Sequence, residues 1–157
     1  MVILGIDPGT ATIGFGVIKK TKNILKFIDC GIITTSPKQS TGERLTNLHK
    51  NISSLIRRLK PDFLVVEKLY FFKNLKTALP VSEARGVILL AASQQKVKVI
   101  ELTPLQIKIG ICGYGRADKK QIQKMVKEIL GLEKIPKPDD AADGLAAAIC
   151  GACNRGG

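Results

Sequence analysis

The stretch VILGIDPG at residues 2–9 decides which fold this chain can adopt. Its apolar start is typical of a strand that is buried on both faces of a sheet. Asp7 ends that strand, and Pro8 and Gly9 follow it directly. A lone ionised carboxylate at such a position costs several kcal/mol unless another group compensates its charge. The stretch therefore predicts a central strand with a charged site at its end.

Four further segments have the composition of strands. Residues 14–19 and 24–34 are rich in β-branched side chains and flank the polar turn KTKN, so with the first strand they predict a three-stranded antiparallel meander. Phe63–Glu67, FLVVE, and residues 96–102 predict two short buried strands that run parallel to the first. The predicted fold class is α/β, with a mixed five-stranded sheet of three antiparallel and then two parallel strands, flanked by helices.

Helices are expected between and after these strands. The signals are a capping box at Ser40 and Glu43 with a stop at Pro61, a helical segment over 83–95 after the loop YFFKNLKTA, an N-cap at Thr103 before Pro104, a basic helix that ends at Gly131, and a small-residue helix in DDAADGLAAAIC. We assign the element order βββαβαβαα. Crossovers between parallel strands are right-handed, so residues 63–67 can lie beside the first strand. Asp7 and Glu67 would then emerge at the same edge of the sheet.

A third group of acids lies near the end of the chain, in DDAAD at 139–143. Residues three or four apart share a helix face, so Asp143 can pair with Asp139 or with Asp140, and periodicity does not choose between them. Alternatively, Asp139 caps the helix and its neighbours complement the helix dipole. That alternative leaves Asp7 and Glu67 unexplained. Carboxylates from three chain positions at one edge instead predict a site for two Mg²⁺ or Mn²⁺ ions that cleaves phosphodiesters.

Composition indicates a single domain with a polyanionic partner. The 157 residues carry 25 Lys and Arg against 13 Asp and Glu, which gives a net charge of +12. Such a charge favours nucleic acid as the partner, the alternative being a merely solvated basic surface. The length predicts one domain over residues 1–157. Without signal-peptide features or a long apolar run, we expect a cytoplasmic protein that has no membrane contact.

Several of these segments resemble, in order, the motifs of the RuvC family of bacterial Holliday-junction resolvases. They are GIDPGTATIGFGVI, FLVVEKLYFFKN, SEARGVILLAA, GYGRADKKQIQKMV and PDDAADGLAAAI, and they extend from residue 2 to about residue 150. The resemblance implies a ribonuclease-H-like domain and a Mg²⁺-dependent endodeoxyribonuclease with two ions per active site, for which Mn²⁺ can substitute. It also implies a homodimer that resolves four-way DNA junctions by paired symmetric nicks in recombination and repair, alongside a branch-migration helicase complex of the RuvA and RuvB type.

By the same resemblance, the catalytic acids and metal ligands are Asp7, Glu67, Asp140 and Asp143. This alignment prefers Asp140 over Asp139.

DNA contacts are also implied at basic and aromatic positions. Tyr70 corresponds to an aromatic residue that stacks on junction bases, and Lys108 and Lys119 correspond to lysines that hold phosphate near the scissile bond. Arg116 and Lys120 lie near the segment GYG, from which we expect their charges to reach DNA phosphates.

Other functions and assemblies are open at this point. GIDPGTATIG also resembles the phosphate loop of actin-like and sugar-kinase ATPases, although those proteins need two lobes. A catalytically weak junction-binding module would bind junctions without cutting them, and a related ribonuclease-H-like nuclease would cut RNA. The apolar segment Val87–Ala92 can be covered by a partner subunit or by another helix of the same chain.

Overall fold

The fold is built around the predicted mixed sheet. It is seen in a computed structural model that describes residues 1–9, 11–68 and 75–153. The described strands are β1 Val2–Asp7, β2 Thr12–Thr21, β3 Ile24–Thr34, β4 Phe63–Glu67 and β5 Lys98–Leu102. Their order across the sheet is β3-β2-β1-β4-β5. β1 is central, antiparallel to β2 and parallel to β4, which confirms the predicted meander and crossover.

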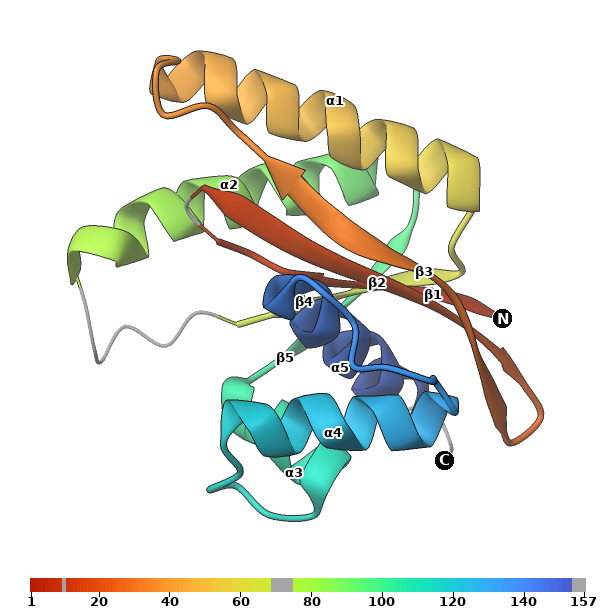
Figure 1. Ribbon diagram of the computed structural model, residues 1–157. Coiled ribbons are helices and arrows are strands. Elements are labelled where there is room, and N and C mark those ends of the chain that lie inside the picture. The colour runs from red at the N-terminus through yellow and green to blue at the C-terminus, as the bar shows by residue number, and fades with distance from the viewer. Residues whose placement is uncertain (10, 69–74, 154–157) are drawn as a thin grey trace.

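Helices cover both faces of this sheet (Figure 1). The described helices are α1 Thr41–Leu59, α2 Leu75–Gln94, α3 Pro104–Cys112, α4 Lys119–Leu130 and α5 Asp139–Cys153. α1 and α2 lie on one face, whereas α5 lies directly on the other and α3 and α4 pack outside it. None of the described helices is long and apolar enough to span a membrane.

The local signals that start and stop three helices are present as side-chain contacts. Ser40, Thr103 and Asp118 each cap a helix in a reciprocal capping box, at the starts of α1, α3 and α4. Gly131 ends α4 in the left-handed conformation, where a residue without Cβ is favoured. These ends are defined by short-range hydrogen bonds, so they can be predicted from sequence.

Two expectations about the helices were wrong. α2 begins at Leu75, well before residue 83, so the last residues of the loop YFFKNLKTA are helical. Its first turn contains no acid, and Pro80 lies inside it, which argues from sequence against a helix that continues through this position. In addition, three helices follow β5 within the described residues, because α3 forms a separate helix that the order βββαβαβαα did not count.

The hydrophobic core is divided between the two faces of the sheet. Ile6, Ile52 and Ile88 belong to the cluster that β1, α1 and α2 share. Ile3 and Leu145 belong to the cluster between the sheet and α5. Both clusters contain completely buried side chains, so the central strands are covered on each side, as their continuous apolar sequence requires.

The α5 backbone lies unusually close to β1 and β2. A Cβ added at Gly144 would lie 2.6 Å from the carbonyl carbon of Phe15 and 2.7 Å from the backbone nitrogen of Gly16. Added Cβ atoms at Gly5 and Gly14 would likewise clash with the backbone of α5. The small residues on the helix and the glycines on the strands therefore allow a contact between backbones. This contact places the first turn of α5 beside the end of β1.

The substitution Gly144→Ala is expected to destabilise the protein by about 3 kcal/mol, because its Cβ would meet backbone that cannot move aside. Urea unfolding followed by circular dichroism measures the change. Gly42→Ala is the matched control, since Gly42 is also helical but nothing lies within 4 Å of its added Cβ. That control should be neutral or stabilising by up to about 1 kcal/mol. Equal effects of the two substitutions would contradict the close-packing argument.

Candidate active site

Three carboxylates from distant parts of the chain meet at one edge of the sheet. Asp7 ends β1, while Asp140 and Asp143 lie in the first turns of α5. One oxygen from each of the three lies within 4.8 Å of the others, and among the described residues this is the group of acids, histidines or cysteines that could hold a metal ion. Asp140, and not Asp139, therefore belongs to this group, a choice that helical periodicity left open.

Glu67 reaches the same region from the neighbouring strand. Ile6 and Val66 are paired in the parallel register of β1 and β4, so Asp7 and Glu67 follow at corresponding positions. Both acids line an open pocket of about 320 Å³, together with Asp143. Glu67 lines this pocket beside Asp7 and Asp143, although it is not part of the compact three-acid group.

The electrostatics of these acids are unfavourable in the absence of a cation. Burial and then repulsion from Glu67 raise the pKa of Asp7 from 3.8 to about 8. Burial and then repulsion from Asp143 raise the pKa of Glu67 from 4.5 to about 7, although Lys108 opposes this shift. Burial also raises the pKa of Asp143. A divalent cation with oxygen ligands would remove both the desolvation cost and the repulsion, so the residues present fit such an ion.

Asp139 is paired elsewhere. It accepts a hydrogen bond of 2.9 Å from the ammonium of Lys137, and this contact lowers the pKa of its carboxyl group. Asp139 lies at the helix start outside the three-acid group, so the two adjacent aspartates have different surroundings.

The lysines implied by the resemblance lie at the pocket. Lys119 is the first residue of α4, and its ammonium lies 2.9 Å from Asp143 Oδ2 and 3.9 Å from Asp140 Oδ1. The hydrogen bond to Asp143 raises the pKa of Lys119. Lys108, from α3, lines the same pocket. The ammonium groups of two lysines therefore lie beside the acids, where a phosphate that enters the pocket would find hydrogen-bond donors.

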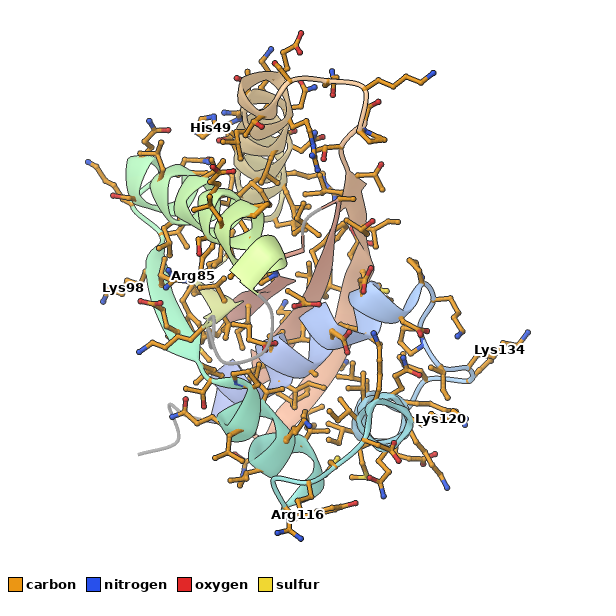
Figure 2. The ribbon with its side chains drawn as sticks, turned by 90° about the vertical axis from the view of Figure 1, so that its left-hand side faces the viewer. His49, Arg85, Lys98, Arg116, Lys120 and Lys134 are labelled. Carbon is orange, nitrogen blue, oxygen red and sulfur yellow. The ribbon has the colours of Figure 1, made fainter. Side chains whose placement is uncertain are left out.

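The remaining predicted DNA-binding residues are not gathered at the acids. Arg116 and Lys120 are exposed and do not line the pocket, and Figure 2 shows both pointing outward from the α3 and α4 side of the molecule. Tyr70 lies outside the described residues, so its position relative to the acids is not described.

Sequence reasoning identified the small residues of α5 but missed the strand glycines that also allow this convergence. Gly14 pairs with Asp7 across β1 and β2, and a Cβ added there would clash with the Asp140 backbone. Gly16 lies two residues further along, on the same face of the strand, and a Cβ added there would clash with the Leu145 backbone in α5. The alternation of glycine at 14 and 16 within a strand-like segment was the available signal, because such glycines mark close backbone approach.

In the ion-free protein, the free energy of unfolding should fall as pH rises from about 4 to about 8. Asp7 and Glu67 hold protons in the folded state up to about pH 8 and 7, but release them near 3.8 and 4.5 when exposed. The folded state therefore binds more protons over this interval, and rising pH favours unfolding. Asp7→Asn should be more stable than the parent at pH 8.5 by about 2 kcal/mol or more, and little changed at pH 4. Urea titrations in chelator at both pH values test this, and an equal shift at both would contradict it.

Known proteins share both the sequence and this architecture. The family model for "Crossover junction endodeoxyribonuclease RuvC" matches residues 3–151. The protein of that name from Petrotoga mobilis is 53% identical over 150 residues, which are 96% of this chain and 92% of that protein. Its counterpart from Fusobacterium nucleatum is 52% identical over 149 residues, which are 95% of this chain and 78% of that protein.

Solved structures agree with the sequence comparison. Thermus thermophilus RuvC in complex with a Holliday junction substrate matches with a TM-score of 0.90 at 34% identity, over 97% of this chain and 93% of that chain. The yeast mitochondrial Holliday junction resolvase matches with a TM-score of 0.70 at 14% identity, over 94% of this chain and 76% of that chain, and shows a shared fold alone. The sheet and its flanking helices are thus the ribonuclease-H-like fold found in RuvC. On the family match and the extent of the identities, this chain belongs to the RuvC family.

Proposed function

We propose that this chain is a metal-dependent endodeoxyribonuclease that resolves four-way DNA junctions by paired symmetric nicks. The observation that carries the proposal is the meeting of Asp7, Asp140 and Asp143 at one sheet edge, with Glu67 on the wall of the same pocket. Family membership favours junction resolution over the ATPase and RNA-nuclease alternatives. It also supports one nuclease domain over residues 1–157, a role in recombination and repair, and a cytoplasmic location.

The acids provide the ligands for the ions that this chemistry needs. We assign Asp7, Glu67, Asp140 and Asp143 to two Mg²⁺ ions per site, with Mn²⁺ as a substitute, because carboxylate oxygens suit both ions. When bound there, such ions would supply an attacking water of lowered pKa and positive charge for the departing 3′ oxygen. Asp7 lies at the end of a strand, and Asp140 and Asp143 lie on a helix. The geometry of their carboxylates is therefore set before DNA arrives.

Basic side chains hold the DNA around the acids. Lys108 and Lys119 bind phosphate beside the scissile bond, since both ammonium groups border the pocket. Arg116 and Lys120 contact the backbone of a junction arm further away, and Tyr70 stacks on an unpaired base near the exchange point. The chain's net charge of +12 attracts the phosphate backbone to this surface.

Junction cleavage with end-labelled strands tests the function. The protein with Mg²⁺ or Mn²⁺ should nick two opposing strands of a mobile four-way junction and leave duplex, flap and RNA substrates intact. Asp7→Asn should lower cleavage by at least about 100-fold and leave junction binding unchanged, because it removes metal charge and not the basic surface. Asp139→Asn is the matched control and should cleave within about threefold of the parent, since Lys137 holds that acid.

Other outcomes of the same assay would reject the proposal. Tight junction binding without scission would identify a binding module. Preferential cleavage of RNA would identify an RNA nuclease. Loss of cleavage in Asp139→Asn equal to that in Asp7→Asn would contradict the assignment of the acids.

A homodimer is the proposed assembly, because two identical sites suit the near two-fold symmetry of a junction. On α2, Ile88 and Ala91 are buried, but Leu79 and Leu90 are 67% and 51% exposed. These two leucines are about three helical turns apart and share a face. α1 packs beside α2 without covering them, as the bond of 2.8 Å between His49 Nε2 and Gln94 Oε1 illustrates. By family resemblance, a branch-migration helicase complex of the RuvA and RuvB type is a further proposed partner.

Leu90→Glu should convert the dimer to a monomer, because it places a charge in the proposed apolar contact. Sedimentation equilibrium in ion-free buffer measures the mass. Ile24→Glu is the control, since Ile24 is 61% exposed on β3, away from α2, and its replacement should leave the dimer intact. A parent protein that sediments as a monomer would contradict the assembly.

A further inference from the structure

Lys119 makes the closest cationic contact to the acid cluster among the described residues. Its ammonium lies 2.9 Å from Asp143 Oδ2 and 3.9 Å from Asp140 Oδ1. These two acids, with Asp7, form the compact group whose oxygens lie within 4.8 Å of one another. A single positive charge therefore already stands beside the carboxylates to which the ions are assigned.

The backbone of Lys119 is fixed, whereas its side chain can move. Asp118 caps α4 and forms a reciprocal capping box with Gln121, so the first turn of the helix that carries Lys119 is well defined. The Lys119 side chain is 50% exposed, while that of Asp143 is only 23% exposed. The lysine can thus turn toward another anion through rotation of its own flexible side chain, without movement of the buried acid.

We propose that Lys119 is the resident counter-ion of the acid cluster in the ion-free protein, and that it competes there with the divalent cation. The inference rests on the proposed metal site. An ammonium in contact with Asp143 would stand next to an ion bound by the same carboxylate, and like charges at that separation repel strongly. Ion binding therefore requires Lys119 to move away, or proceeds with reduced affinity.

The competition has a consequence for DNA binding. A phosphate in the pocket offers Lys119 an alternative anion, so DNA would draw the ammonium away from Asp143 and favour ion binding. Linkage is reciprocal, so bound ions would favour DNA equally. Lys108 differs from Lys119, because it lines the same pocket but has no ion pair with an acid in the part of the chain that the structure describes.

Direct Mn²⁺ titration of the DNA-free protein tests the proposal without reference to activity. The signal of free Mn²⁺ in electron paramagnetic resonance gives the dissociation constant at pH 8. Lys119→Met should bind Mn²⁺ about tenfold more tightly than the parent, within the usual range of coupling between two sites. Lys119→Arg, which keeps the charge, should bind as the parent does. Lys124→Met is the matched control, because Lys124 is exposed on the same helix and the described residues offer it no acid partner.

A second measurement separates counter-ion competition from a merely structural contact. In chelator at pH 8, Lys119→Met should melt at a lower temperature than the parent, because the acids lose their compensating charge. It should also gain more thermal stability from added Mn²⁺ than the parent gains. If the Met variant does not fold, Lys119→Gln repeats both measurements with a polar side chain.

The outcomes distinguish this inference from the proposed function. Asp7→Asn should bind Mn²⁺ far more weakly than the parent, and unchanged binding in that variant would reject the metal site itself. If Asp7→Asn weakens binding as expected and Lys119→Met leaves Mn²⁺ affinity unchanged or weaker, the metal site stands and the counter-ion role of Lys119 is overturned.

Discussion

The cost of burying several carboxylates close together, where they also repel one another, is the constraint on which the rest of this structure depends. Asp7, Glu67 and Asp143 all have raised pKa values, with burial as the largest cause, so the folded protein holds them together at a cost. A rigid scaffold is needed to keep such groups close. The two hydrophobic clusters provide it, because they cover β1 on both faces and fix the end of that strand.

The convergence also depends on which backbone atoms can touch. Gly14 and Gly144 allow α5 to lie directly on β2, so that Asp140 and Asp143 arrive beside Asp7. Larger side chains at these positions would separate the helix from the sheet, and the acids with it. The glycines therefore shape the site as much as the carboxylates do. The carboxylates can share an ion only at the short separation that this packing of α5 on the sheet allows.

The chain combines acidic and basic features on different length scales. A net charge of +12 draws a polyanion toward the surface from a distance, whereas Asp7, Glu67 and Asp143 line a single pocket and act only there. Lys108 and Lys119 are basic side chains that line the same pocket as the acids. In the ion-free protein Lys119 pairs with Asp143, so the same lysine that suits a phosphate also compensates the acids before DNA is present.

The sequence by itself determined the strands, their order, most helix ends and the candidate acids, because apolar periodicity and capping act over a few neighbouring residues. It misplaced the start of α2, which has no acid in its first turn and contains Pro80, and the element order βββαβαβαα left α3 uncounted. Helical periodicity did not choose between Asp139 and Asp140, and the resemblance alone favoured Asp140; the tertiary structure brings Asp140 to Asp7 and pairs Lys119 with Asp143. These contacts depend on how closely α5 packs on β1 and β2 and on where α4 begins beside α5. Such distances join segments that are remote in the chain, so no local sequence pattern encodes them.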